Sequence, residues 1–322
     1  MAGCPALVLT RDRHARLQIE RALRAMDLVV ESRASEGELH ARLGESGARV
    51  IVVDCDELAH EEVEPLLLDA VPRVPVVLIA RSPEPETLIA LMQRHGLYNL
   101  IAKHDVIGGP HPMLDERELI VTCQKLLAPG IFGLDRYVCG CGIVLRESLV
   151  ASIADKAAFL REFERFVTEL RVPVSVISDV VTVADELILN ALIHAPRTAS
   201  GEPKYEESPR ALLTMEDAER VPVAYGCDGK RLMLSVADPF GALEKGSITR
   251  YVLPALRQHP LPVETKPGGG GLGLAFTVRR CHQMVFNVQP QVRTEVIAGW
   301  YIRGPSAREF RQVGKSVNAF WA

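Results

Sequence analysis

The first 128 residues alternate short apolar runs with segments of helical periodicity. Five of the apolar runs are typical of buried strands, and a helical pattern follows each of them. Apolar strands that alternate with helices predict a parallel sheet covered on both faces, that is, a five-stranded α/β domain of flavodoxin-like class over residues 1–128. The expected strands are 6–9, 28–30, 49–53, 74–80 and 97–102, and the expected helices are 13–26, 35–43, 61–70, 84–95 and 116–127.

The second half of the chain combines longer helical patterns with strand-like runs. An Asp-Gly turn at 228–229 joins two of these runs and is typical of a β-hairpin. Helices beside a mostly antiparallel sheet predict an α+β sandwich over residues 149–304. The expected helices are 148–170, 180–196, 248–258 and 272–282, and the expected strands are 221–225, 231–237, 285–288 and 292–302.

Two segments lie outside these predicted domains. Residues 129–148 are rich in glycine and have no sustained period, which predicts a linker. Residues 305–322 are too few for a domain, so we expect a C-terminal tail. The amphipathic helix predicted over 148–170 can pair two subunits in a homodimer or pack on the second domain, and the sequence leaves both alternatives open.

Composition and charge are those of an ordinary globular chain. The 322 residues are 48% hydrophobic and 24% charged, and this length favours two domains. The net charge of −4 and the absence of a basic block argue against nucleic acid as a partner. The longest apolar run, residues 74–80, is too short to span a membrane. Seven scattered cysteines do not form a disulfide framework, so we expect a cytoplasmic protein.

Charged residues follow three of the strands predicted in the first domain. They are Asp12 after the first strand, Asp54 after the third and Lys103 after the fifth. The carboxyl ends of parallel strands meet at one edge of the sheet, where such folds bind ligands. This pattern resembles the receiver domain of two-component signalling, which implies an Asp that is phosphorylated with the help of Mg²⁺ and a Lys.

The receiver pattern is incomplete in this sequence. Receivers carry an acidic pair directly after the first strand, and Thr10 and Arg11 stand there instead. Arg11 would place a fixed positive charge where Mg²⁺ should bind. We therefore interpret residues 1–128 as a degenerate receiver that is not phosphorylated at Asp54 and that serves as a docking surface for a protein partner.

The strongest chemical pattern begins in the helix predicted over residues 180–196. Glu186, Asn190 and His194 recur there every four residues, so they share one face. Two further elements follow in order: Asp238 in the sequence D-P-F-G, which ends at Gly241, and a glycine-rich stretch that opens the helix predicted over 272–282.

Each of these residue types suits one part of a nucleotide. The amide oxygen of Asn190 suits an Mg²⁺ ion that bridges phosphates, and Glu186 can orient or deprotonate a nucleophile beside that ion. Asp238 suits the exocyclic amine of adenine, and Gly241 allows close approach of the backbone. Backbone N–H groups at a helix start bind phosphate. The expected phosphate-binding residues are Lys266, Gly269, Gly270, Gly271 and Gly273.

Taken together, E-L-I-L-N-A-L-I-H, D-P-F-G and G-G-G-L-G-L resemble the three nucleotide-binding motifs of the GHKL ATPase superfamily over residues 150–304. This resemblance implies ATP and Mg²⁺ as cofactors, with His194 near the nucleotide. The second motif departs from the usual Asp-x-Gly because its glycine is displaced by one residue. The predicted helix 148–170 has no histidine, which argues against a typical histidine autokinase. The remaining pattern resembles the compact anti-sigma-factor kinases.

Three functions remain open at this point. The first is a signalling regulator that binds ATP, binds a protein partner and phosphorylates it on Ser or Thr, with Glu186 as the catalytic base. The second is a non-catalytic scaffold in which both domains serve only as docking surfaces. The third is a working response regulator phosphorylated at Asp54, which Arg11 argues against.

Overall fold

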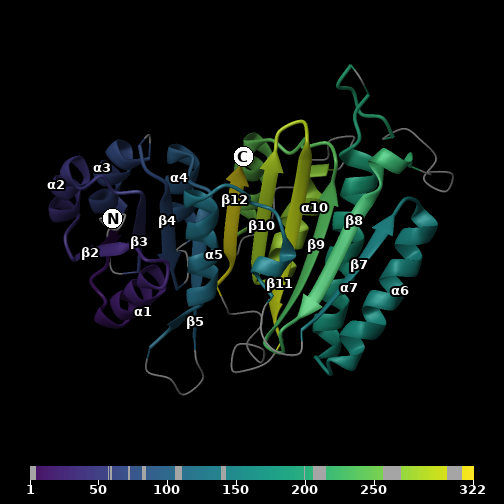
Figure 1. The fold of residues 1–322 in the computed structure, drawn as a ribbon, viewed down its shortest axis with the longest axis horizontal. Helices are drawn as coiled ribbons and strands as arrows, with labels where there is room; N and C mark the ends of the chain where they lie inside the picture. Colours follow the sequence, from purple (N-terminus) through teal and green to yellow (C-terminus); the bar gives the residue numbers. More distant parts are fainter. Residues whose placement is uncertain are drawn as a thin grey trace. The chain divides into compact units, whose positions relative to one another are not determined.

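The structure is a computed structural model, and the chain forms two compact units, which comprise residues 1–130 with 304–320 and residues 131–303 with 321–322 (Figure 1). Each unit has its own sheet and its own covering helices. The described residues are 5–56, 58, 60–71, 73–81, 85–105, 111–138, 143–198, 200–205, 215–256, 270–302 and 314–322.

The first unit is a doubly wound α/β fold. Its parallel strands have the order β2-β1-β3-β4-β5, and helices follow them in the chain. This order is the one that flavodoxin and CheY share. The strands are β1 (Pro5–Leu9), β2 (Val29–Arg33), β3 (Val50–Asp54), β4 (Val76–Ala80), β5 (Asn99–His104) and the short β6 (Met113–Leu114). The helices are α1 (Arg13–Arg24), α2 (Glu36–Ser46), α3 (His60–Ala70), α4 (Pro85–His95) and α5 (Glu116–Leu127).

The central strands of this unit are apolar on both faces because helices cover both. Ala6 and Val8 contribute to the core beneath α1 and α5, which pack on each other, whereas Leu7 and Leu9 alternate with them and are equally buried. Side chains of successive strand residues point to opposite faces, so a strand buried on both sides needs a continuous apolar run. The α/β prediction for this part of the chain is confirmed.

The last strand of the chain joins the first unit. β12 (Ser316–Trp321) is antiparallel to β5, with Val317 opposite Leu100 and Asn318 opposite Asn99. The buried Glu118 of α5 accepts hydrogen bonds from Ser316 Oγ at 3.1 Å and from Asn318 Nδ2 at 3.0 Å. The expectation of a tail over 305–322 is therefore wrong for these residues, because a buried carboxylate on a distant helix satisfies their polar side chains.

The second unit contains an antiparallel sheet with the strand order β10-β11-β9-β8-β7. Figure 1 shows helices α6, α7 and α10 against one face of this sheet. The strands are β7 (Val144–Val150), β8 (Val221–Cys227), β9 (Arg231–Asp238), β10 (Gln283–Gln289) and β11 (Arg293–Tyr301). The longer helices are α6 (Ile153–Glu169), α7 (Val174–Leu189) and α10 (Gly270–Arg280). The shorter ones are η1 (Leu134–Arg136), η2 (Asn190–His194), η4 (Asp217–Glu219), α8 (Lys245–Ser247), η5 (Ile248–Val252) and α9 (Leu253–Ala255).

Aromatic rings join α6 to the sheet of the second unit. The Tyr225 ring of β8 lies 4.8 Å from the ring centre of Phe163 and 5.0 Å from that of Phe166. Phe159 joins the same cluster, at 5.7 Å from Tyr225. Large aromatic side chains bury much surface, so this face of α6 contributes to the core of its own unit. Of the two roles left open for this helix, packing on the second domain is the one observed.

The helix predicted over residues 148–170 begins later than expected. Residues 144–150 form β7 instead, and Ser152 caps α6 by accepting a hydrogen bond from the backbone N–H of Asp155. The linker predicted over 129–148 is thus partly strand. Val150 has helical spacing with Ile153 and Ala157, but it is the last residue of β7 and is buried there.

The opposite face of the second sheet carries a buried polar cluster. Glu295 of β11 accepts hydrogen bonds from Ser235 Oγ and Asn287 Nδ2, each at 2.8 Å, and from the backbone N–H of Gly133 at 3.0 Å. Gly133 directly precedes η1 in the segment that follows α5. Glu295 therefore fixes the start of the second unit to its central strands.

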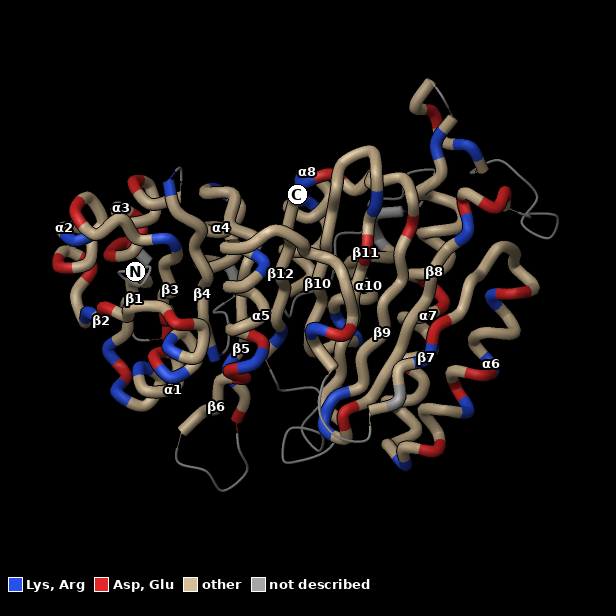
Figure 2. The backbone as a smooth tube through the Cα atoms, in the orientation of Figure 1, with Lys and Arg blue, Asp and Glu red and all other residues tan. Residues whose placement is uncertain are grey.

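Charge is distributed without large blocks of one sign. Figure 2 shows Lys and Arg interspersed with Asp and Glu in both units. Within the described residues, no helix is long and apolar enough to cross a membrane, and no cluster of three metal-ligating His, Cys, Asp or Glu side chains is present.

Candidate functional site

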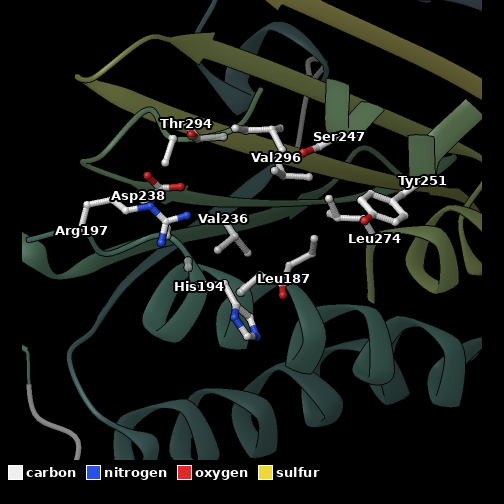
Figure 3. A pocket seen from close by; sticks show the side chains of 15 residues that line it. Leu187, His194, Arg197, Val236, Asp238, Ser247, Tyr251, Leu274, Thr294 and Val296 are labelled. Carbon is white, nitrogen blue, oxygen red and sulfur yellow. The ribbon is translucent and has the colours of Figure 1, made fainter. Parts of the chain in front are cut away.

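A cavity of about 240 Å³ lies between the helices and the sheet of the second unit (Figure 3). Its apolar wall consists of Leu187, Val236, Leu274 and Val296, and a few polar groups interrupt it. Such a cavity is the usual form of a small-molecule site. The lining residues are Leu187, Asn190, Ala191, His194, Ala195, Arg197, Val236, Asp238, Ala242, Leu243, Ser247, Tyr251, Leu274, Thr294 and Val296.

Asp238 is the last residue of β9 and lines this cavity. Its Oδ1 accepts hydrogen bonds from the backbone N–H groups of Phe240 at 2.9 Å and of Gly241 at 3.3 Å, so the turn that follows β9 orients the carboxylate. Burial raises the pKa of Asp238 to about 6, although these N–H donors act in the opposite direction. A buried carboxylate with a perturbed pKa in a cavity is a typical recognition group for a ligand that donates hydrogen bonds.

Asn190 and Glu186 meet the start of α10. A Cβ added at Gly273 would lie 2.5 Å from Glu186 Oε1 and 3.6 Å from Asn190 Nδ2, so glycine at this position leaves room for the Glu186 carboxylate beside α10. Asn190 begins the π-helical turn η2, a feature that is frequent at functional sites. Its Nδ2 is buried and makes no hydrogen bond to the described part of the chain.

This junction has the chemistry of an anion and cation site. The first turn of α10 offers backbone N–H groups and the positive end of the helix dipole, and these favour a phosphate. The amide of Asn190 can donate to a phosphate oxygen through Nδ2 and ligate a cation through Oδ1. The residues present therefore fit a nucleotide with Mg²⁺, as the sequence predicts.

The sequence did not identify four of the polar residues in the cavity, namely Ser247, Thr294, Arg197 and Tyr251. Thr294 is opposite Asp238 in the register of β11 and β9, and Figure 3 shows the two side chains next to each other. Arg197 and Tyr251 line the cavity from the segment after η2 and from η5. His194 lines it as well. A distance of 56 residues separates Thr294 from Asp238, so only the strand pairing relates them.

Gly241 has a structural reason to be glycine. Its φ angle is +60°, and a Cβ would lie 2.1 Å from the carbonyl oxygen of Gln289, the last residue of β10 before the turn to β11. The backbone N–H of Gln291 also donates to the carbonyl of Gly241 at 3.2 Å. This glycine thus allows the turn after β9 to pack on the next turn, and its predicted approach to adenine stays a prediction.

Part of the predicted phosphate loop lies outside the described residues. This holds for Lys266 and Gly269. Gly270 and Gly271 are the first two residues of α10, and Gly273 lies in its first turn. The described part of the motif is therefore the helix start beside Asn190.

The first unit brings together two of the three predicted receiver residues. Lys103 Nζ lies 2.7 Å from Asp54 Oδ1 and 2.6 Å from Asp56 Oδ2, and Thr10 Oγ1 donates to Asp54 Oδ2 at 2.9 Å. Asp12 instead caps α1 by accepting a hydrogen bond from the backbone N–H of His14 at 2.7 Å. Thr10 and Asp56 were missed, although both adjoin strand ends in the sequence.

Burial and charge have opposite effects in this cluster. Burial raises the pKa of Asp54, and the neighbouring Lys103 only partly offsets this effect. Burial disfavours the charged form of Lys103, but Asp54 and Asp56 outweigh it and raise the pKa of its ammonium group. The ammonium therefore stays charged at neutral pH and contacts both carboxylates.

Arg11 does not enter this cluster. Its guanidinium forms ion pairs with Glu62 at 3.0 Å and with Glu36 at 3.8 Å, and all three side chains are partly exposed. The effect of Arg11 on a metal ion beside Asp54 stays a prediction. Lys103 supplies the positive charge at Asp54 instead.

The strand order of the first unit, with Asp54 and Lys103 at the carboxyl ends of β3 and β5, is that of CheY-type receivers. The first unit is receiver-like in fold. In structure the chain is similar to a CheY-like receiver domain from Methanospirillum hungatei, with 19% identity over 39% of this chain and 94% of that chain and a TM-score of 0.33. It is also similar to the chemotaxis regulator CheY4 of Vibrio cholerae, with 18% identity over 39% of this chain and all of that chain and a TM-score of 0.32.

A third similar structure is the receiver domain of Ssk1 from Saccharomyces cerevisiae, solved with the histidine phosphotransfer protein Ypd1. It has 13% identity over 39% of this chain and 89% of that chain, with a TM-score of 0.30. No protein-family model and no curated protein matches the chain.

Proposed function

We propose that the second unit is a GHKL-type module that binds ATP with Mg²⁺, and that the chain is a two-component-type signalling regulator. The observation that supports this most strongly is the position of Asp238 and Asn190 on one cavity. Asp238 provides an acceptor for adenine, and Asn190 lies where α7 meets the start of α10. The two residues thus suit the base and the phosphates, which are the two ends of a nucleotide.

In this proposal the residues of the chain divide the recognition between them. Asp238 accepts a hydrogen bond from the exocyclic amine of adenine, and Val236 and Val296 contact the base. Asn190 and the first turn of α10 hold the phosphates together with the metal ion. The Mg²⁺ ion, when bound, neutralises charge on the phosphates.

Glu186 is the proposed catalytic base. Its carboxylate lies beside Asn190 at the phosphate end, against Gly273. From there it can orient or deprotonate a Ser or Thr hydroxyl of a partner protein, or a water molecule, for attack on the terminal phosphate. The products are then ADP and a phosphorylated partner, or ADP and inorganic phosphate.

The proposed catalytic step is tested by separating turnover from binding. Glu186→Ala should retain binding of Mg²⁺–ATP and lose release or transfer of γ-phosphate, followed with ATP labelled at that position. The matched control is Asp185→Ala, which changes the neighbouring carboxylate on α7, one that pairs with Lys156. Equal turnover in the parent protein and in Glu186→Ala would contradict the role of Glu186.

The first unit is proposed to serve as a docking domain. Lys103 and Thr10 occupy both oxygens of Asp54, so the cluster is a closed ion pair network rather than an open metal site. This observation also favours the second candidate function, a scaffold that binds partners without chemistry. A chain that binds a partner but binds no nucleotide would support the scaffold.

A further inference from the structure

Arg197 is a half-buried cation on the wall of the cavity. Its one described hydrogen bond runs from Nη1 to the carbonyl oxygen of Pro196 and is long, at 3.4 Å. A guanidinium has five N–H donors and two flat faces, and a half-buried one usually makes several hydrogen bonds or stacks on a ring. The side chain is thus placed for a ligand rather than for its own fold.

The backbone around Arg197 holds this side chain at the cavity. Arg197 forms a β-bridge with Pro203, and the N–H of Thr198 donates to the carbonyl of Glu202 at 2.8 Å. The resulting short hairpin follows directly on η2, whose last residue is His194. A residue fixed by backbone pairing presents its side chain with less loss of entropy than one in an irregular loop.

Arg197 lies at the adenine end of the cavity in the proposed function. Figure 3 shows it beside Asp238, whereas Leu187, one turn before Asn190, lies toward Leu274 and Tyr251. The phosphate end is where Asn190 meets Gly273 of α10. A base that reaches Asp238 therefore passes close to Arg197, and the phosphates do not.

We infer that Arg197 holds the flat face of its guanidinium against the purine bound at Asp238 and so determines affinity for the nucleoside part of the ligand. This inference rests on the proposed nucleotide site. Guanidinium groups stack on aromatic rings because they are planar and weakly hydrated, and a Lys ammonium does this poorly. Arg197 then acts on the base and not as a counter-ion of the phosphates.

The test compares adenosine with Mg²⁺–ATP as ligands of the full chain, by calorimetric titration. Arg197→Ala should weaken both ligands by the same factor, roughly five- to tenfold for one lost stacking contact. Arg197→Lys keeps the charge and should not restore either affinity. Arg250→Ala is the matched control because it removes the same charge. Arg250 is an exposed arginine of η5 that does not line the cavity.

Two results would overturn the inference while leaving the nucleotide site intact. One is a loss for ATP alone that Arg197→Lys restores, which would make Arg197 a phosphate contact. The other is an unchanged affinity for both ligands in Arg197→Ala, with the thermal midpoint of the parent protein. If the parent protein binds neither ligand, the proposed function fails and the role of Arg197 fails with it.

Discussion

Gly273 lies directly against Glu186, so closely that a Cβ at this position would be 2.5 Å from Oε1. Gly273→Ala should therefore displace the Glu186 carboxylate, which is the mobile end of its side chain. Because alanine favours the helix by about 0.5–1 kcal/mol over glycine, the fold should keep its stability. We expect the thermal midpoint to stay within a few degrees while γ-phosphate turnover falls as far as in Glu186→Ala.

The control for this variant is Gly246→Ala. Gly246 lies in the short helix α8, and no atom lies within 4 Å of a Cβ there. It should leave turnover unchanged. Full turnover in Gly273→Ala would mean that the contact with Glu186 is unimportant for the reaction.

Lys103 is expected to be essential for the stability of the first unit. Lys103→Met leaves Asp54 and Asp56 with no cation in a buried site, and losing one partner of such a pair costs about 3–5 kcal/mol. Burial raises the pKa of Asp54 and Lys103 opposes this effect, so the variant raises that pKa further and protonation of Asp54 at lower pH relieves the repulsion between the two carboxylates. Urea unfolding should therefore show a larger loss at pH 8 than at pH 5.

Arg11→Met provides the comparison for Lys103→Met. The ion pairs of Arg11 with Glu62 and Glu36 are partly exposed, and exposed pairs contribute less than about 1 kcal/mol. A loss in Arg11→Met as large as that in Lys103→Met would contradict the assignment of the buried charge to Lys103.

Asp238 should stabilise a ligand and destabilise the free protein. Its folded pKa of about 6 is above the ordinary value of 3.8 for an Asp side chain, so the folded state binds more protons than the unfolded state between these pH values. Stability is thus lost as pH rises from about 4 to about 6, and this penalty of up to about 3 kcal/mol persists at higher pH. Asp238→Asn should raise the thermal midpoint at pH 7 but not at pH 4.

The same substitution should change which base is bound. An amide at position 238 can still accept the N–H groups of Phe240 and Gly241 through its oxygen, but it places an NH₂ group where the second carboxylate oxygen was. Affinity for ATP should then fall at least tenfold. Affinity for inosine triphosphate, which has a carbonyl where adenine has its exocyclic amine, should fall less. Equal losses for both nucleotides would argue against contact between Asp238 and the base.

Glu295 is expected to fix the segment between α5 and β7. Glu295→Ala removes the acceptor of two buried donors, Ser235 Oγ and Asn287 Nδ2, and of the partly buried Gly133 N, at about 1–3 kcal/mol for each buried group left unsatisfied. Amide hydrogen exchange at residues 131–138 should accelerate strongly. Ser235→Ala removes one donor and should cost only about 1 kcal/mol. Unchanged exchange in Glu295→Ala would show that other contacts hold this segment.

The sequence predicted the first unit well because short apolar runs and helical periods, which are local patterns, mark its strands and helices. Apolar runs such as Val50–Val53 are buried on both faces, and the predicted helix 116–127 has the same bounds as α5. β7 was missed because apolar and polar residues do not alternate along it: Val144 and Leu145 come before Arg146, Glu147 and Ser148, and Leu149 and Val150 follow them. β12 was missed because its buried polar residues depend on Glu118, about 200 positions earlier.

Some residues of the candidate site could be predicted from the sequence, and others could not. Glu186 and Asn190 share a helix face, and Asp238 ends a strand, so spacing alone suggested them. Thr294 reaches the cavity only through the register of β11 with β9, and Arg197 only through a short hairpin. Neither relationship leaves a pattern along the chain, so both needed the fold.

The most direct test of the nucleotide site is a titration of the full chain with a fluorescent ATP analogue, with and without Mg²⁺. Asn190→Ala and Asp238→Ala alter the two ends of the cavity, and Asp217→Ala, an exposed residue of η4, is the control. We predict saturable binding that Mg²⁺ strengthens, that both cavity variants weaken at least tenfold and that the control retains. An absence of binding in the parent protein, or equal affinity in all variants, would contradict the account.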